Sequence, residues 1–209
     1  MKLSANDFLR FAQLGVSTVY EASGRQGLID LPLERLIVGS SVAGLARTVS
    51  CAQGDNLSMH AVLATVQPGE ILVLTMPIAE PVALVGDLLA TQAKQKGVAG
   101  MLINAGIRDA DELRQLGLPI WARFIRSKGA TRDQIGIIGQ PIELGGATIC
   151  TGDLLVLDGD GAVVVAIAQV ESVLKAAEQR FEREASLKTR FLAGEISIDV
   201  YNLRQKVGL

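Results

Sequence analysis

The amino-acid sequence predicts a mixed α/β fold in a single domain, residues 1–209. Three observations support this prediction. Helical patterns alternate with short apolar runs in the first part of the chain, short strands with Gly-Asp turns fill residues 140–166, and a long amphipathic helix follows from Ala168. The expected parts are a helical N-terminal segment (1–30), an α/β core (31–167) and a C-terminal helical segment (168–209).

The N-terminal segment predicts two short helices within residues 5–24, because Gly15 interrupts the helical pattern. We expect Asn6 or Asp7 to cap the first helix. The second helix is expected to begin at the Ser-Thr pair 17–18, since a glutamate three residues after the threonine completes a capping-box spacing.

The central segment predicts alternating strands and helices. A run of small and β-branched residues at 40–51 is typical of a strand. Residues 54–69 predict a helix capped by Asp55 or Asn56, and residues 70–76 predict a buried strand. This order is typical of strands that pair in parallel and are joined by helices.

A second helix-and-strand unit follows. Its helix has one apolar face, with Gly97 at the position of a C-terminal stop. Residues 98–103 predict a short buried strand, the segment DADELRQLG predicts a helix, and LPIWAR predicts another strand. The apolar face of the first helix consists of Leu84, Leu88, Leu89 and Ala93.

The predicted secondary structure changes twice in the last part of the chain, first to short strands and then to a long helix. The segments PIELGG, ATICTGD and LLVLDGDGAVVVA predict short strands with Gly-Asp turns. A helix is then expected from Ala168 to about Ala193, with Gly194 at its end. Its apolar face consists of Val170, Val173, Leu174, Ala177 and Phe181.

Composition narrows the classes of function. The net charge is -2 and charged residues make up 20% of the chain, so no basic field favours nucleic acid as a partner. The apolar runs are too interrupted for a membrane-spanning helix, and the N-terminus lacks the pattern of a signal peptide. We therefore expect a cytoplasmic protein with no membrane partner and no nucleic-acid partner.

The chain also has few cysteine and histidine side chains that could bind a metal ion. Cys51 and Cys150 are far apart in the sequence, and we expect two small buried thiols rather than a disulfide. The single histidine, His60, lies beside apolar positions of its helix and is expected to be a packed or capping histidine. Because the usual His and Cys spacings of a zinc site are absent, the chemistry must use charged side chains, backbone amides or a hard metal ion.

The first candidate site lies in the stretch GMLINAGIRDADELRQLG, where Arg108 and Asp109 follow an apolar run and Gly106. One interpretation is a helix entry, with Asp109 as the cap and Arg108 in solvent. The other is a ligand site, because polar side chains at the carboxyl end of a strand commonly hold ligands in open α/β sheets. Arg108 would then bind a carboxylate in a bidentate fork, and Asp109 would bind a divalent cation.

The second candidate site is the helix start GDLLA. Asp87 fits a simple helix cap, but the free amides of such a helix start also fit an anion, with Gly86 leaving room for it. If the helix and the returning strand bring Asp87 close to Arg108, two carboxylates, a guanidinium and two amides surround one spot. This set suits a small 2-oxo acid bound to Mg²⁺ or Mn²⁺, in which the arginine offsets the charge of a developing enolate. The two amides are those of Leu88 and Leu89.

A longer stretch, GDLLATQAKQKGVAGMLINAGIRDADELRQLGLPIWAR, resembles the signature region of the 4-hydroxy-4-methyl-2-oxoglutarate aldolase family. That family shares its fold with the regulator of ribonuclease E activity A. The segments TVYEASGRQGLID, GDNLSMHAVLATVQPGEILVL and LAGEISIDVYNLR also resemble family segments, in the same order. The resemblance implies a swivelling β/β/α domain with N-terminal helices and a long C-terminal helix, assembled as a homotrimer or as a hexamer of two trimers.

The resemblance further implies a class II pyruvate aldolase that depends on a divalent metal cation, Mg²⁺ or Mn²⁺. Such an enzyme cleaves 4-hydroxy-4-methyl-2-oxoglutarate or 4-carboxy-4-hydroxy-2-oxoadipate to pyruvate, and it decarboxylates oxaloacetate through a metal-stabilised enolate. Carried over to this sequence, Asp109 would be the direct metal ligand and Asp87 would act through a metal-bound water. The pyruvate moiety would be held by Arg108, Gly86, Leu88 and Leu89.

Acidic residues from other parts of the chain are implied as well. Family sites lie between subunits, and an acidic residue from the C-terminal helix of a neighbour completes them. Glu184 is the candidate for this role and Glu182 is the alternative. Glu21 matches another acidic family position near the site. Asn104 departs from the aspartate that many aldolase members have, which leaves the native substrate open.

The sequence leaves two alternatives to this function. One is a non-catalytic regulator that binds a ribonuclease or a helicase through its surface, because a shared fold does not dictate function. The other is a related lyase for another 2-oxo acid, as the departure at Asn104 suggests.

Overall fold

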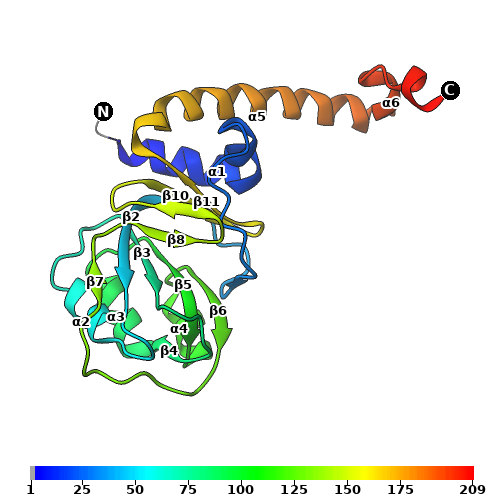
Figure 1. The fold of residues 1–209 in the computed structure, drawn as a ribbon. Helices are drawn as coiled ribbons and strands as arrows, with labels where there is room; N and C mark the ends of the chain where they lie inside the picture. The colour runs from blue at the N-terminus through cyan, green and yellow to red at the C-terminus, as the bar shows by residue number, and fades with distance from the viewer. Residues whose placement is uncertain (1–2) are drawn as a thin grey trace.

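The computed structural model describes residues 3–209; Met1 and Lys2, with which the predicted N-terminal segment begins, lie outside the described residues. Its helices are α1 (Ala5–Ala22), α2 (Leu57–Val62), α3 (Asp87–Gln95), α4 (Ala110–Leu116), α5 (Val170–Leu192) and α6 (Ser197–Val200), with 3₁₀ turns at Ile167–Gln169 and Arg204–Val207. Figure 1 shows α1 beside α5 in an upper layer, and a curved sheet with α2, α3 and α4 below them.

The described strands form one nine-stranded mixed sheet and a separate two-stranded hairpin. The main path of the large sheet is β1-β6-β5-β3-β2-β10-β11, with β4 beside β5 and β7 beside β2; the hairpin is β8-β9. The strands are β1 (Glu34–Arg35), β2 (Val42–Ser50), β3 (Glu70–Thr75), β4 (Ala83–Val85), β5 (Gly100–Ile107), β6 (Ile120–Ile125), β7 (Ile137–Ile138), β8 (Ile142–Leu144), β9 (Ala147–Ile149), β10 (Leu154–Asp158) and β11 (Gly161–Val165).

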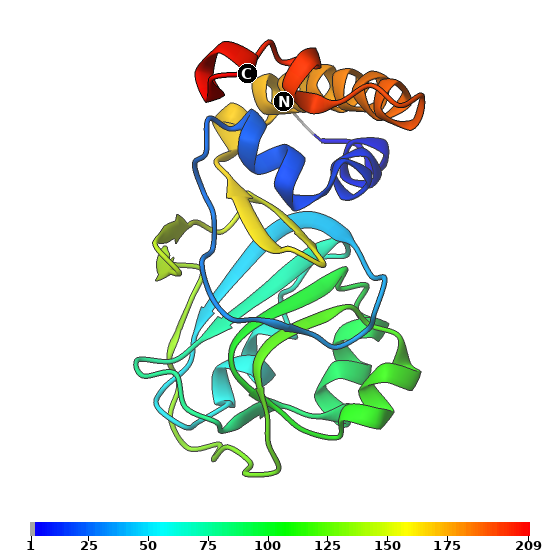
Figure 2. The ribbon, with the colours of Figure 1, turned by 90° about the vertical axis from the view of Figure 1, so that its right-hand side faces the viewer.

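Parallel pairing dominates the centre of the large sheet. β2, β3, β5 and β6 are parallel neighbours, whereas β10 and β11 extend the sheet on one side by antiparallel pairing. Helices α2 and α4 follow β2 and β5 along the chain, as parallel crossovers require. Figure 2 shows how strongly the strands curve. This architecture confirms the predicted mixed α/β fold with a long C-terminal helix.

The short strand β4 decides where the candidate site residues meet. β4 pairs in parallel with the end of β5, and Val85 lies opposite Ile107. Glycine is required at position 106, because a Cβ on Gly106 would lie 2.8 Å from the Val82 carbonyl oxygen. Both strands therefore end side by side at the lower edge of the sheet in Figure 1. The residues that leave them are Gly86, Asp87, Arg108 and Asp109.

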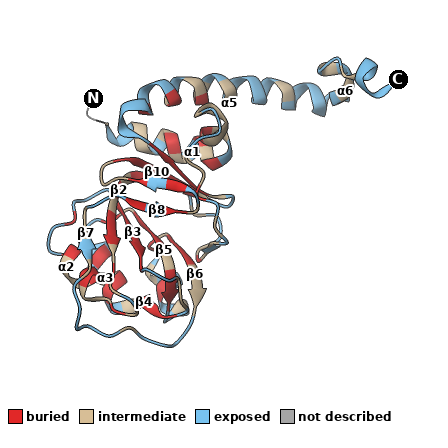
Figure 3. Cartoon of the chain, viewed as in Figure 1, coloured by how far each residue is buried: buried red, intermediate tan, exposed pale blue. Residues whose placement is uncertain are grey.

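Three apolar clusters hold these layers together, and Figure 3 shows their buried residues on both faces of the sheet. One cluster lies between the sheet and the short helices and includes Met59 and Leu113. A second includes Trp121, whose indole N–H donates to the Asp158 carbonyl at 2.8 Å. The third packs α1 and α5 on the β10–β11 pair.

The beginning of α1 differs from the expectation. The prediction that Asn6 or Asp7 caps this helix is wrong, because Ser4 is the N-cap. The Ser4 N–H donates to Asp7 Oδ2 at 2.8 Å and the Asp7 N–H donates to Ser4 Oγ at 3.3 Å. This is a capping box, which satisfies two free N–H groups at once and so is favoured over a single cap.

Gly15 interrupts α1 as predicted, with φ 78° and ψ 166°. The expected local cap at 17–18 is wrong, however. A carboxylate at the end of β10 takes this role, since Asp158 Oδ2 accepts from the Val16 N–H at 2.8 Å. The Ser17 hydroxyl donates instead to Asp160 at 2.7 Å. The second half of α1 is therefore fixed by long-range contacts with the β10–β11 turn.

Several predicted boundaries change in the core. Leu84 was expected on a helix, but it lies in β4, and α3 begins only after Gly86. The short run before that glycine pairs with β5, and this pairing overrides the helical pattern. The helix predicted over 54–69 is reduced to α2, and the strand predicted over 98–103 continues as β5 to Ile107.

The C-terminal helix confirms its prediction. α5 ends at Leu192, just before Gly194, and it packs on the body only through its first half, where Val173 and Ala177 are buried. Figure 3 shows its distal half and α6 as mainly exposed. Among the helices formed by residues 3–209, none is both long and apolar enough to cross a lipid bilayer.

The two cysteines are free thiols, as predicted, but only Cys51 is buried as expected, whereas Cys150 is half-buried. Cys51 is buried, and burial together with the nearby Asp55 carboxylate raises the pKa of its thiol to about 12. Desolvation also raises the pKa of Cys150. Both thiols therefore stay protonated near neutral pH and are poor nucleophiles.

Candidate active site

The pairing of β4 with β5 places the two candidate stretches in direct contact. Asp109 Oδ2 accepts a hydrogen bond from the Asp87 N–H at 3.1 Å. The missing side chain of Gly86 permits this approach, because a Cβ there would lie 2.5 Å from Asp109 Oδ2 and 3.2 Å from Arg108 Nε. The four residues thus surround one position at the N-terminus of α3.

Asp109 adopts an unusual backbone conformation. Its φ of 60° and ψ of 45° lie in the left-handed region, which costs a non-glycine residue about 1–2 kcal/mol. Asp109 is the N-cap residue of α4 by position, yet its side chain makes no capping hydrogen bond there. The carboxylate points instead to the start of α3, so the simple interpretation of Asp109 as a helix cap does not hold.

The N-terminus of α3 offers backbone donors at the same spot. Gly86 is its N-cap residue, and the first backbone bond of the helix runs from the Ala90 N–H to the Gly86 carbonyl at 3.1 Å. The N–H groups of Leu88 and Leu89 precede that bond, so they are left for a ligand or solvent. Asp87 does not cap the helix, and its Oδ1 accepts only a long bond of 3.4 Å from the Thr91 hydroxyl.

Arg108 is held from two sides. Its Nε lies 3.7 Å from Asp109 Oδ2, and its guanidinium lies against Gly129, where a Cβ would come within 2.7 Å of Arg108 Nη1. Half of the side chain, 51%, remains exposed. The guanidinium is thus positioned by its neighbours but keeps donors free for a ligand.

A cavity of about 450 Å³ opens beside these residues. One wall comes from α3, a second from α2 and the residue before it, and a third from the segment that follows β6. Such a volume suits a small molecule. The predicted residues that line it are Gly86, Leu88, Leu89, Arg108 and Asp109.

The cavity also contains residues that the sequence did not single out as a site. His60 lines it from α2, whereas the sequence predicts a packed or capping histidine. Asn56 donates from Nδ2 to the Leu84 carbonyl at 3.0 Å, while its buried Oδ1 has no partner among residues 3–209. Gln92 and Arg132 complete the polar lining. The only sequence signal for the first two was their common position in the GDNLSMH segment, directly after a predicted strand.

The third wall belongs to the crossing segment, which we define as residues 126–136 between β6 and β7; it runs across the lower end of the sheet in Figure 1. Buried Asp55 holds it in place. Asp55 Oδ2 accepts from the Thr131 hydroxyl and the Asp133 N–H, both at 2.6 Å, and Oδ1 accepts from the Leu57 N–H at 2.8 Å. Burial opposes the charged form, but these hydrogen bonds outweigh it and lower the pKa of Asp55 to about 2.

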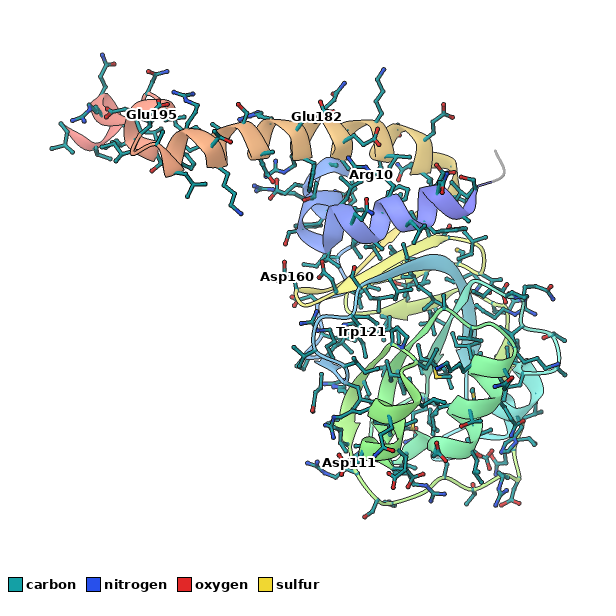
Figure 4. All side chains as sticks on the ribbon, turned by 180° about the vertical axis from the view of Figure 1, so that it is seen from behind. Arg10, Asp111, Trp121, Asp160, Glu182 and Glu195 are labelled. Atoms are coloured by element: carbon teal, nitrogen blue, oxygen red, sulfur yellow. The ribbon has the colours of Figure 1, made fainter. Side chains whose placement is uncertain are left out.

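The other acidic candidates lie elsewhere in the chain. Glu21 on α1 and Glu184 on α5 both contact Arg180, at 3.8 Å and 2.8 Å. Glu182 also belongs to α5, and Figure 4 shows it at the opposite end of the molecule from Asp111 of α4. Within one chain these acids are therefore remote from the cavity. The contribution of Glu184 or Glu182 from a neighbouring subunit stays a prediction.

Asn104 lies inside a polar row on the sheet. Its Oδ1 accepts from Arg123 Nη1 at 3.2 Å, and its Nδ2 donates to the Thr75 hydroxyl at 3.4 Å. It is not among the residues that line the cavity. An effect of Asn104 on substrate choice would therefore have to act through this row.

The donor atoms around the cavity suit a hard divalent cation. Asp109 offers carboxylate oxygens in the cavity lining, and Asp87, which is not part of the lining, lies next to it at the start of α3. Mg²⁺ and Mn²⁺ prefer such oxygens, and water can complete their coordination shell. In the part of the chain that the structure describes, no group of three or more His, Cys, Asp or Glu side chains is placed to hold a metal ion. Among the described residues, the carboxylates of Asp87 and Asp109 are therefore not joined by a third ligand of this kind.

The architecture defines the class of protein as a swivelling β/β/α domain with N-terminal helices and a long C-terminal helix. The chain belongs to the RraA-like family, because the family model described as Aldolase/RraA matches residues 16–164. This match includes the whole candidate site, from α2 to the crossing segment, and ends before α5.

Relatives in this family have names that differ in function. A Halalkalibacterium halodurans protein provisionally named 4-hydroxy-4-methyl-2-oxoglutarate aldolase is 33% identical over 167 residues, which cover 79% of this chain and 80% of the relative. The crystal structure of Streptomyces coelicolor RraAS2, described as an unusual member of the RNase ES inhibitor RraA protein family, has a TM-score of 0.79 and 28% identity, with 90% of this chain and 98% of that chain covered.

A third relative carries yet another description. A Geobacillus kaustophilus structure described as an S-adenosylmethionine:2-dimethylmenaquinone methyltransferase has a TM-score of 0.67 and 27% identity, covering 72% of this chain and 93% of that chain. The three names describe a lyase, an inhibitor family and a methyltransferase. Membership in the family therefore does not decide the activity, and the chemistry of the site has to.

Proposed function

We propose that this protein is a divalent-metal-dependent lyase for small 2-oxo acids, a class II pyruvate aldolase. The observation that carries this proposal is the Asp109 carboxylate, which a strained backbone turns toward the start of α3 beside Arg108. Strain of this kind persists where the surrounding structure holds it for a function. A protein that only binds another protein through its surface has no need of it.

The chain's own groups supply an anion site. Arg108 binds the substrate carboxylate through a bidentate pair of N–H donors. The N–H groups of Leu88 and Leu89 donate to the same end of the substrate, which lies at the positive end of α3. Gly86 and Gly129 leave the space that the Arg108 side chain occupies, and Asp109 lies 3.7 Å from its Nε. This placement would orient the substrate as it binds.

The metal complements this anion site. Asp109 would hold Mg²⁺ or Mn²⁺ directly, and Asp87 would hold a water on it. The bound ion supplies Lewis-acid polarisation of the 2-oxo group. Arg108 and the N-terminus of α3 offset the negative charge that develops on the substrate as its carbon–carbon bond breaks.

The proposed substrates follow from this chemistry and from the name of the Halalkalibacterium relative. They are 4-hydroxy-4-methyl-2-oxoglutarate and 4-carboxy-4-hydroxy-2-oxoadipate, which release pyruvate, and oxaloacetate, which loses carbon dioxide to give pyruvate. All three place a carboxylate next to a 2-oxo group, so the same contacts with Arg108 serve each of them.

We further propose that the site is completed between subunits of a homotrimer or hexamer. The exposed distal half of α5, which extends beyond α1 in Figure 1, is a suitable element to reach a neighbour. Glu184, with 47% of its side chain exposed, is the first candidate for the added carboxylate, and Glu182 is the second. Glu21 would support Glu184 through their shared contact with Arg180.

A regulator that binds a ribonuclease is the second candidate function. The likeness to Streptomyces coelicolor RraAS2 supports it. The two candidates differ in what they require of Asp109, because binding through an outer surface does not use a carboxylate inside the cavity.

Pyruvate release is the measurement that separates these functions. Lactate dehydrogenase and NADH would report pyruvate formed from each proposed substrate with Mg²⁺, with Mn²⁺ and with EDTA. We expect turnover with either metal, loss of turnover with EDTA and recovery when Mg²⁺ is restored. If a panel of hydroxylated 2-oxo diacids gives no metal-stimulated pyruvate above the rate without protein, the lyase proposal fails and the regulator is favoured.

A further inference from the structure

The crossing segment, residues 126–136, lacks regular secondary structure, yet backbone hydrogen bonds fix it at several points. The Ala83 N–H donates to the Lys128 carbonyl at 2.7 Å, and the Asn56 N–H donates to the Thr131 carbonyl at 2.9 Å. The buried carboxylate described above holds the residues that follow. A long loop that is anchored this firmly is typical of a functional element.

The anchoring places Arg132 at the cavity. Arg132 lines it from the crossing segment, three residues after Gly129, which contacts Arg108. Extended chain of this length spans up to about 10 Å. The residue before Arg132 is bonded to Asn56, on the α2 side of the cavity. The cavity therefore has one guanidinium beside α3 and a second one toward α2.

The charges of the lining leave Arg132 without a partner. Its charged side chains are Arg108, Arg132 and Asp109. None of the ion pairs formed within residues 3–209 includes Arg132, and the residue is exposed. Once Asp109 serves a cation, no acidic side chain of the wall neutralises this second guanidinium. Such a group attracts an anion, and its planar fork fits a carboxylate.

We propose that Arg132 is a specificity-determining residue that binds the second carboxylate of a 2-oxo dicarboxylic acid. Arg108 takes the carboxylate next to the 2-oxo group, and Arg132 takes the one at the far end of the molecule. The inference rests on the proposed function of the site. It also goes beyond it, because it assigns the choice between dicarboxylates and monocarboxylates to one residue of the crossing segment.

Two ligands of equal chain length isolate this contact. 2-Oxoglutarate carries the second carboxylate, whereas 2-oxopentanoate has a methyl group in its place, and neither has the hydroxyl group that aldol cleavage needs. Calorimetry with Mg²⁺ would give both dissociation constants. We expect the protein to bind 2-oxoglutarate at least about tenfold more tightly, as a charge-assisted bidentate contact implies.

Arg132→Gln tests the residue itself. This variant is expected to bind the two ligands within about twofold of each other, through weaker binding of 2-oxoglutarate alone. Lys128→Gln is the matched control, because it removes the same charge from the same segment at an exposed position outside the cavity lining; it should keep the preference. Thermal unfolding of both variants would show that they fold, since exposed substitutions change stability little.

The outcomes separate this inference from the proposed function. An Arg132→Gln protein that keeps the tenfold preference overturns the role of Arg132, and so does a parent protein that binds both ligands equally. Neither outcome bears on the lyase proposal, because pyruvate release from the proposed substrates tests that proposal separately. A parent protein that binds neither ligand and releases no pyruvate overturns both.

Discussion

Two aspartates on either side of the cavity show how one residue type takes opposite tasks. Asp55 is buried, with 2% of its surface exposed, and its carboxylate accepts four hydrogen bonds. Asp109 is exposed to the cavity, accepts one backbone N–H and has a strained backbone. The first carboxylate is fully satisfied by the protein, whereas the second is left with capacity for a ligand.

The difference in hydrogen bonding associates Asp55 with the stability of the fold and Asp109 with the function of the site. A carboxylate that the fold satisfies completely stabilises the folded state, and its removal leaves several donors without a partner. A carboxylate held in a costly conformation with free lone pairs contributes little to stability and much to a site. Substitutions at the two positions should therefore change different measurements.

Asp109→Asn should have the largest effect. Asparagine tolerates the left-handed conformation, so the fold is kept, but the charge that would hold the cation is lost. We expect kcat/KM for pyruvate release to fall on the order of 10³-fold, with little change in Tm. Asp111→Asn, in the first turn of α4 and labelled in Figure 4, is the matched control and should keep full activity. A folded Asp109→Asn protein with normal turnover would defeat the assignment.

Gly86→Ala tests the contact between the two stretches. The added methyl group would lie 2.5 Å from Asp109 Oδ2, so the carboxylate or the start of α3 must shift. A displacement of this kind is expected to lower kcat/KM about 10²-fold. The φ of -130° at Gly86 suits alanine, so backbone strain does not contribute. Unchanged kinetics together with an unchanged circular dichroism spectrum would contradict the tight packing at this position.

Asp55→Asn should act on stability instead. Its amide cannot accept all the hydrogen bonds that the carboxylate accepts, so we expect the free energy of unfolding at pH 7 to fall by about 1–3 kcal/mol in urea titrations. Asp133→Asn, an exposed aspartate of the crossing segment, is the control. Equal stability of the two variants would show that the hydrogen bonds to Asp55 contribute nothing.

The pH dependence of stability has a definite sign. The pKa of Asp55 is about 2 in the folded protein and about 3.9 in an unfolded chain, so its stabilising effect is complete above about pH 5. The effect is lost progressively as the pH falls from about 5 through about 2. Urea titrations over this range should show a steeper loss for the parent protein than for Asp55→Asn. Parallel curves would contradict a lowered pKa.

Arg108→Lys should have the smallest effect on kcat/KM among the variants of the site. Lysine keeps the positive charge but loses the fork that binds both oxygens of a carboxylate. We expect kcat/KM to fall more than tenfold, mainly because substrate binding is weaker. Direct calorimetry of pyruvate with Mg²⁺ would check the origin of the loss, and pyruvate affinity equal to that of the parent would contradict the role of Arg108.

The sequence predicted those parts of the site that depend on local patterns. Gly86 and Asp87 at a helix start, and Arg108 and Asp109 after an apolar strand, are features of short segments with clear periodicity. The structure places the two pairs in contact, but the reason, the pairing of β4 with β5, was not foreseen. A strand of three residues directly before a helix resembles the first turn of that helix, which is why Leu84 was misplaced.

The features that the sequence did not reveal depend on long-range contacts. Asp158 caps the second half of α1 although it lies 142 positions away from Val16 in the sequence, and no local pattern predicts such a cap. The crossing segment has neither helical nor strand periodicity, so nothing in it pointed to Arg132 as part of a cavity. The pairing of Asp55 with Asp133 joins residues 78 positions apart, and only the folded chain displays it.

The residues of the cavity come from separate stretches of the chain, and this matters for engineering and for divergence within the family. Within one chain, the residues proposed to hold the metal and the 2-oxo acid belong to the stretch 83–109, whereas the proposed selecting arginine belongs to a separate one, 126–136. Exchange of the crossing segment between relatives is therefore expected to change substrate preference, provided that Gly129, which leaves space for Arg108, is kept. A library of this segment with Gly129 fixed is a direct route to lyases with new substrates.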